Sequence, residues 1–192
     1  MNFNQHSELE GRHAIFSGSQ YAWINYSEEK MIETVENLSA QELGTELHDL
    51  AAKCIKHRRK QKGSDYFSQY VNDAIGFGMT PEVPLKFNDY FFGFADSIKF
   101  DERKMFLRIH DLKTGATPTH FQQLMIYATF FCLEYHFKPR DIEMELRIYQ
   151  NPTEKQPDLP RIYIPGIDEI VPIYDKVISF TNRYLGNNRV TI

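Results

Sequence analysis

The chain has 192 residues, of which 42% are hydrophobic, which is enough for one ordinary domain with a single sizeable core. Its formal net charge of -4 argues against a protein that coats nucleic acid by bulk positive charge, although it leaves room for a local basic face. The two cysteines, Cys54 and Cys132, are too few for a disulfide framework or a four-thiolate metal site.

The sequence carries no sign of a membrane segment or of a second domain. No stretch approaches the roughly 18 consecutive apolar residues of a membrane span. Residues 1–13 lack the apolar region of a signal peptide. Since no repeat, low-complexity tract or linker divides the chain, we expect a single domain over residues 1–192 in a soluble, cytoplasmic protein with no membrane partner.

The first part of the chain predicts helices, because apolar residues recur there at helical spacing and capping residues precede them. The expected helices are 26–38, capped by Ser27; 39–63, opened by a capping box of Ser39 and Glu42 and stopped by Gly63; and 64–78.

From Pro81 onward, apolar and polar residues alternate with the period of two that is typical of strands. This pattern predicts three consecutive antiparallel strands, over 82–87, 90–100 and 105–113, joined by turns at Asn88-Asp89 and at 101–104.

A helix and a further strand follow these three strands. The helix is expected over 120–137, with Thr119 as its cap and Gln122 completing a capping box, and the strand over 141–149. A short strand at 161–165 and a helix from about Glu169 to Leu185, stopped by Gly186, complete the prediction.

Two charged residues stand on the buried side of the third strand. Asp111 and Lys113 are two positions apart, so their side chains share a face with Leu107 and Ile109. Removing two charges from water costs several kcal/mol each unless something compensates, and a metal ion would do so. Asp96 on the preceding strand could converge with Asp111, and two carboxylates about 5 Å apart repel by roughly 3 kcal/mol at an effective dielectric near 20. Such oxygen ligands suit Mg²⁺ or Mn²⁺.

Three further polar residues lie on the predicted helices. His48 shares a helical stripe with Ala51, and it could equally be a histidine at the core edge with a local hydrogen bond. Gln123 and Tyr127 are four residues apart and therefore share one helix face, as they also would on an ordinary amphipathic helix. Taken singly, each of these residues leaves both interpretations open.

Four short motifs in this order resemble the RecB-type branch of the PD-(D/E)XK nuclease superfamily, which includes small phage-encoded exonucleases. They are GTELH at 44–48, GFAD at 93–96, DLKTG at 111–115 and QLMIY at 123–127. The resemblance extends from about residue 17 to 152 and implies an α/β (α+β) fold with a restriction-endonuclease-like core. That core is a mixed central sheet flanked by helices, in the order α-β-β-β-α-β, here with extra N- and C-terminal helices.

The resemblance also implies roles for individual residues. Asp96 and Asp111 match the metal-binding carboxylates, Leu112 would add its backbone carbonyl, and His48 of the G-x-x-x-H signature would add a nitrogen ligand. Lys113 matches the lysine that orients the attacking water and helps to deprotonate it. The residues that brace the site or contact DNA would be Gln123, Tyr127 and Thr114, while Glu82 occupies the place of an acid often found on the first strand, outside the ligand set.

A basic run, KCIKHRRKQK at 53–62, follows His48 on the predicted helix. Such a run often only complements the helix dipole at a solvated helix end. Because DNA needs cationic contacts near the metal, we favour contacts from Arg58, Arg59 and Lys62 to the DNA backbone.

The sequence thus predicts a Mg²⁺- or Mn²⁺-dependent DNA exonuclease of a bacterial or phage-infected cell, acting in replication, recombination or end processing. DNA is the expected partner, together with a homo-oligomer or a recombination or replication protein, because the chain contains no Walker-type motor motif. With two cysteines no iron–sulfur cluster is expected. The alternatives are an endonuclease of the same superfamily and a catalytically silent nuclease-fold module that binds DNA or protein.

Overall fold

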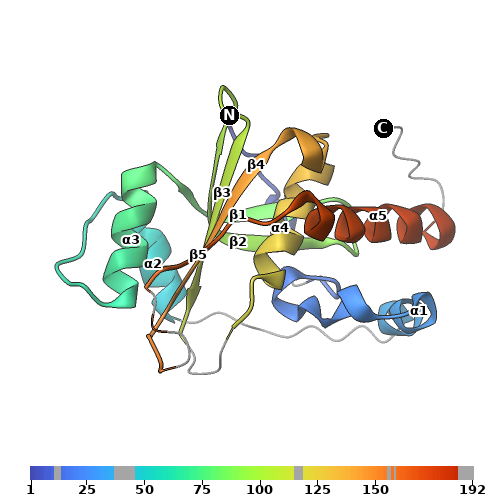
Figure 1. The fold of residues 1–192 in the computed structure, drawn as a ribbon, viewed down its shortest axis with the longest axis horizontal. Coiled ribbons are helices and arrows are strands. Elements are labelled where there is room, and N and C mark those ends of the chain that lie inside the picture. The colour runs from blue at the N-terminus through green and yellow to red at the C-terminus, as the bar shows by residue number, and fades with distance from the viewer. Residues whose placement is uncertain (11–13, 37–45, 115–118, 155–156, 158, 186–192) are drawn as a thin grey trace.

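A five-stranded mixed sheet forms the centre of the structure, a computed structural model that describes residues 1–10, 14–36, 46–114, 119–154, 157 and 159–185 (Figure 1). The strands lie in sequence order, and every neighbouring pair is antiparallel except β3 and β4, which are parallel because α4 carries the chain back between them. The strands are β1 (Thr80–Lys86), β2 (Phe92–Asp101), β3 (Phe106–Lys113), β4 (Glu143–Gln150) and β5 (Arg161–Tyr163).

Helices flank the sheet, so the expected mixed α/β class is confirmed, as is the element order of helix, three strands, helix and strand. None of the helices in the described part of the chain is long and apolar enough to cross a membrane. The helices are η1 (Ser7–Leu9), η2 (Gly18–Asn25), α1 (Glu28–Glu36), α2 (Glu46–Lys56), α3 (Tyr66–Phe77), α4 (Gln122–Glu134), η3 (Pro139–Asp141) and α5 (Ile167–Tyr184).

The two faces of the sheet carry different helices. The main core lies between one face and α4, which is buried along its length because η2 and α5 pack on its other side. A smaller core lies on the opposite face beneath α2 and α3, where Tyr70 and Val71 meet Leu112 and Tyr149 (Figure 1). Both faces of β3 are therefore buried, although its sequence alternates between apolar and polar residues.

Several local signals are satisfied as expected. The Ser27 hydroxyl accepts a hydrogen bond from Lys30 N at 3.3 Å in the first turn of α1. The Asn88 side chain accepts hydrogen bonds from the backbone of Tyr90 and Phe91 and so closes the β1–β2 turn. In the next turn, Asp101 accepts from the backbone N–H groups of Arg103 and Lys104.

Two predicted helix boundaries are wrong. The helix expected over 39–63 ends at Lys56, because Arg58 adopts a left-handed φ of 54° and Arg59 N donates back to Cys54 O at 2.9 Å. Its expected capping box at Ser39 and Glu42 lies outside the described residues. Thr119 does not cap α4, since its hydroxyl donates instead to Gln150 Oε1 at 3.1 Å.

Candidate active site

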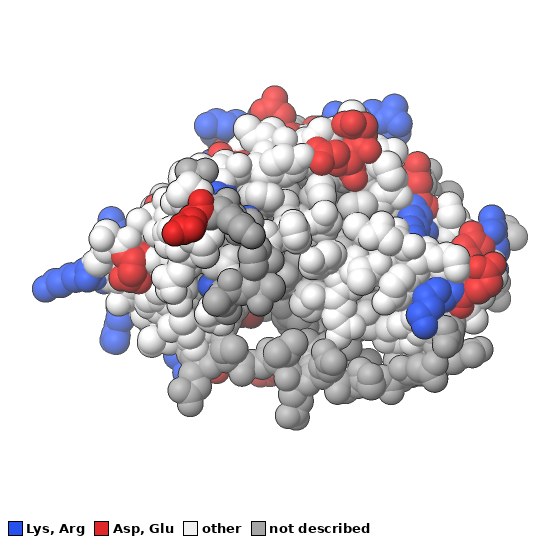
Figure 2. Space-filling view, turned by 60° about the horizontal axis from the view of Figure 1, so that its bottom comes forward, with Lys and Arg blue, Asp and Glu red and all other residues white. Residues whose placement is uncertain are grey.

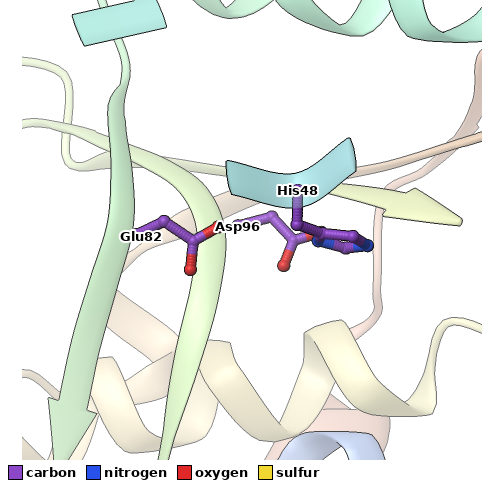
Figure 3. Close-up of side chains that lie close together, drawn as sticks. All are labelled: His48, Glu82 and Asp96. Carbon is purple, nitrogen blue, oxygen red and sulfur yellow. The ribbon is translucent and has the colours of Figure 1, made fainter. Parts of the chain in front are cut away.

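Three side chains from three different elements converge beside the sheet. One ligand atom each from His48 on α2, Glu82 on β1 and Asp96 on β2 lies within 4.8 Å of the others (Figure 3). Since α2 packs on β1, the first turns of this helix are held over the two strands. We call His48, Glu82 and Asp96 the ligand group.

Asp96 holds the centre of the ligand group. Its Oδ2 accepts a hydrogen bond from Leu112 N at 2.8 Å and lies 3.5 Å from His48 Nδ1. The β2–β3 register places Ser97 opposite His110, so that Asp96 and Asp111 are the next facing positions along the two strands. The two aspartates are therefore adjacent along the strand ladder, but Asp111 is not one of the three residues whose ligand atoms lie within 4.8 Å of one another.

Glu82 reaches the ligand group through an unusual backbone conformation. The β1–β2 pairing places Pro81 opposite Ser97 and Val83 opposite Ala95, so Glu82 faces Asp96 across the ladder. Its φ of 49° lies in the left-handed region, which a residue with a side chain occupies only at a cost of about 1–3 kcal/mol. The residue as a whole is exposed, but neighbouring atoms surround its carboxyl group. This loss of water, together with the charge of Asp96, raises the pKa of Glu82.

His48 is electrostatically coupled to the same carboxylates. Burial by itself would lower the pKa of His48, but the hydrogen bond and charge of Asp96, with smaller contributions from Asp111 and Glu82, raise it overall. The imidazole therefore lies in a negative field. A bound cation would compete with the proton for this field.

Asp111 is the most unusual charged group of the site. It is 1% exposed, and among the residues that the structure describes no group other than the Lys113 ammonium is placed to donate to its carboxylate oxygens. Its charged neighbour is Lys113, whose Nζ lies 3.1 Å from Asp111 Oδ2 as an ion pair. Burial raises the pKa of Asp111 to about 6, against the attraction of Lys113 and with a further increase from Asp96. Buried carboxylates with so few donors are rare, so Asp111 is a candidate functional group.

Lys113 is the first member of a chain of hydrogen bonds. Its Nζ donates to Gln123 Oε1 at 2.6 Å, and Gln123 Nε2 donates to Tyr127 Oη at 3.1 Å. The charges of Asp111 and Asp96 raise the pKa of Lys113 although burial opposes this, so the ammonium group stays protonated. The face shared by Gln123 and Tyr127 on α4 therefore serves to orient Lys113.

Two glycines fix the ring of Tyr127. A Cβ atom at Gly18 would lie 2.6 Å from Tyr127 Cε1, and one at Gly93 would lie 2.7 Å from the same atom. Real Cβ atoms do not approach other atoms so closely, so the ring fits between η2 and β2 only because both positions are glycine. The backbone of the GFAD motif thus positions Tyr127 as well as Asp96.

These donors suit a small divalent cation. The ligand group offers two carboxylates and an imidazole, and Asp111 adds a carboxylate for which the Lys113 ammonium is the only donor in the described structure. Carboxylate oxygens suit Mg²⁺ and Mn²⁺, and an imidazole nitrogen favours the transition-metal ion of the two. The fit depends on the chemistry of these side chains and on the burial of Asp111.

The other predicted site residues lie around this centre or away from it. Leu112 is buried, and its N–H is used by Asp96, while Thr114 is exposed at the end of β3. Arg58, Arg59 and Lys62 are exposed in the connection between α2 and α3, and so are not on the helix that carries His48. On the molecular face in Figure 2, the Lys and Arg side chains of the described residues are separated by acidic and uncharged ones and form no continuous basic surface.

Sequence reasoning missed two contributors and underrated a third. The sequence predicts Glu82 outside the ligand set, yet one of its carboxylate oxygens lies within 4.8 Å of the ligand atoms of His48 and Asp96. Gly18, in the SGSQYAW stretch, and Arg161 were not considered. Arg161 binds Thr119 and Gln150 and lies close enough for the charge of Asp111 to offset part of the lowering of its pKa by burial. The proline on either side of the Glu82-Val83 pair was the available signal of an irregular strand.

Comparisons with family models, with curated proteins and with solved structures found no match for this chain. Its function must therefore be argued from the geometry of the site.

Proposed function

We propose that this chain is a metal-dependent deoxyribonuclease with the restriction-endonuclease-like core of the PD-(D/E)XK superfamily, and that it acts as an exonuclease of the RecB-type branch. The observation that carries the proposal is Asp111, a buried carboxylate paired with Lys113, without another donor in the described structure, and facing Asp96 across the strand ladder. The ion pair with Lys113 reaches only Asp111 Oδ2 and leaves Oδ1 without a donor among the described residues, which a purely structural ion pair would not explain.

The ion would be Mg²⁺ or Mn²⁺, held by Asp96, Asp111 and His48 together with Glu82 and the Leu112 carbonyl. A divalent ion bound there would polarise the scissile phosphate and lower the pKa of a coordinated water. The residues of the chain provide the geometry. The Leu112 N–H group fixes one Asp96 oxygen, and the pairing of β1 with β2 places Glu82 opposite Asp96.

Lys113 acts through its charge and its position. Because its pKa is raised, its ammonium group stays protonated and cannot itself accept a proton from water. Lys113 Nζ donates to Gln123 Oε1 at 2.6 Å, and Gln123 in turn donates to Tyr127, so these two residues fix the position of the ammonium group. In this position Lys113 would orient the attacking water and offset the negative charge that develops on the phosphate.

The test is DNA hydrolysis in the presence of Mg²⁺, Mn²⁺ or a chelator, on linear and on circular DNA of the same sequence. The parent protein should degrade linear DNA only when a divalent ion is present, and circular DNA should resist it. The variants Asp111→Asn and Lys113→Ala should each lose at least about 10²-fold in rate. Lys138→Ala, a change at an exposed lysine of the η3 cap, should retain the parent's rate.

Other outcomes would separate the competing functions. Cleavage of circular DNA would indicate an endonuclease of the same superfamily and would overturn the exonuclease assignment. Binding of DNA without hydrolysis under any metal condition would indicate a catalytically silent module. Parent-like activity of folded Asp111→Asn or Lys113→Ala would overturn the assignment of the site.

A further inference from the structure

A cavity of about 310 Å³ lies beside β2, β3 and the end of α3. Lys99 and Arg108 pair with each other across β2 and β3, and Asp101 pairs with Phe106. Because successive residues of a strand point to opposite faces, Lys99 and Arg108 point away from the face that carries Asp96 and Asp111. The residues that line the cavity are Phe77, Lys99, Asp101, Lys104, Phe106 and Arg108.

Arg108 is held in a fixed orientation at this cavity. Its Nε donates to Glu145 Oε1 at 2.7 Å, and its guanidinium lies 3.9 Å from the ring centroid of Phe77 and 5.0 Å from that of Phe106. No hydrogen bond to its two terminal nitrogens is found among the described residues. A guanidinium anchored at one edge, with donors available at the other, is preorganised to bind an oxyanion with two parallel hydrogen bonds.

The surplus of positive charge at the cavity comes from its lysines. Glu145 Oε1 also accepts from Arg147 Nε at 2.8 Å, and Arg147 pairs in addition with Asp73 Oδ2 at 3.4 Å, so two carboxylates balance the two arginines. In the lining, Lys99 and Lys104 then stand against Asp101 alone. The buried His110 beside the two arginines has a lowered pKa, because of its burial and because both arginines repel its protonated form. An anion would therefore enter a positive field here.

Two lysines extend this field to the mouth of the cavity. Within the described part of the chain, neither Lys99 nor Lys104 forms an ion pair through its ammonium group. The one acidic residue of the lining, Asp101, is engaged in its own turn, where Oδ1 accepts from the backbone of Arg103 and Lys104 at 3.1 and 3.3 Å. Three cations thus face a cavity whose carboxylate is already hydrogen-bonded.

The size and lining of the cavity indicate the class of ligand. A volume of 310 Å³ is at the lower end of the range for small-molecule sites, and Phe77 offers an exposed aromatic ring beside the cations. We propose that this cavity binds a nucleoside monophosphate, with the phosphate on Arg108, Lys99 and Lys104 and the nucleoside against Phe77. This site is independent of the proposed nuclease activity.

The test is isothermal titration of the metal-free protein with dAMP and, separately, with inorganic phosphate. Lys99→Gln and Lys104→Gln should each weaken dAMP binding by about tenfold, as expected for the loss of a charge-assisted contact. Lys138→Gln, which removes an exposed lysine outside the cavity lining, should bind as the parent does. Asp111→Asn should also retain the parent's affinity, because Asp111 does not line the cavity.

Two further variants test the chemistry of the site. Arg108→Lys keeps the charge but removes the planar fork, and it should weaken binding of both dAMP and phosphate. Phe77→Leu should weaken dAMP binding more than phosphate binding, because it removes the surface for the nucleoside while the phosphate keeps its three cations. Equal affinity of the parent for the two ligands would overturn the nucleotide assignment. Absence of dAMP binding at millimolar concentration, or unchanged binding in folded Lys99→Gln and Lys104→Gln, would overturn the site.

Discussion

Replacing Asp111 by asparagine should stabilise the metal-free protein above pH 7, although the same change should slow DNA cleavage by at least about 10²-fold. In the folded protein, burial raises the pKa of Asp111 from 3.8 to about 6. An acid whose pKa rises on folding contributes stability that is complete below its unfolded pKa and is lost as the pH rises through its folded pKa. A shift of roughly two pKa units corresponds to about 3 kcal/mol. The parent should lose this amount between about pH 4 and pH 7, and Asp111→Asn should not.

The neighbour of Asp111 does not reverse the sign of this prediction. Lys113 loses its charged partner in the variant, but the attraction between the two residues is already included in a pKa of about 6, and Gln123 still accepts from Lys113. The free energy of unfolding of Asp111→Asn at pH 8 should therefore still exceed that of the parent by about 3 kcal/mol.

The assay is urea denaturation at pH 4.5 and pH 8 in buffer freed of divalent ions. Asp111→Asn should exceed the parent by only about 1 kcal/mol at pH 4.5 and by about 3 kcal/mol at pH 8, whereas Asp175→Asn, at an exposed aspartate of α5, should follow the parent at both. If Asp111→Asn is equally stable or less stable at pH 8, the carboxylate is a satisfied structural group and the argument for a ligand fails.

Three further predictions address other parts of the molecule. His48→Ala should weaken Mn²⁺ binding more than Mg²⁺ binding, because imidazole suits the transition-metal ion; titration calorimetry would measure this, and an equal loss for both ions would contradict the role of His48. Replacing Arg58, Arg59 and Lys62 together by Gln should flatten the slope of log DNA affinity against log salt concentration. The expected change is about 0.7 per lost phosphate contact on a single strand or about 0.9 on a duplex, and an unchanged slope would mean that the basic residues of 53–62 contact only solvent. Gly93→Ala would place a Cβ 2.7 Å from Tyr127 Cε1, so it should destabilise the fold by about 1–3 kcal/mol and slow cleavage by misplacing Gln123. Gly76→Ala, where a Cβ meets no atom within 4 Å, is its matched control in denaturation and cleavage assays, and equal effects of the two changes would contradict the role of Gly93.

Elements whose signals are local could be predicted from the sequence. Period-two alternation located β1 to β4, and the capping of α1 by Ser27 is present as expected. These features depend on residues close together in the chain, so propensity and periodicity suffice to find them.

Features that depend on distant partners could not be predicted. Thr119 has the sequence of a helix cap, but Gln150 and Arg161 bind its hydroxyl from β4 and β5. Arg58 ends α2 in a left-handed conformation that usually requires glycine or asparagine. At Thr119, tertiary contacts override the local preference of the residue.

The residues of the candidate site divide in the same way, into those that local spacing predicts and those that only the pairing of distant strands brings together. Asp111 and Lys113 share a face because of their spacing along one strand, whereas Glu82 joins His48 and Asp96 only through the pairing of β1 with β2 and a backbone φ of 49°. A strained glutamate backbone and a buried aspartate are both unfavourable for the protein alone, and they occur on β1 and β3, on either side of the strand β2 that carries Asp96. Folding tolerates such features where a ligand offsets them, because a cation would bind the carboxylates that now repel one another. Divalent ions should therefore raise the stability of the parent more than that of Asp111→Asn, with the difference growing in proportion to the logarithm of ion concentration.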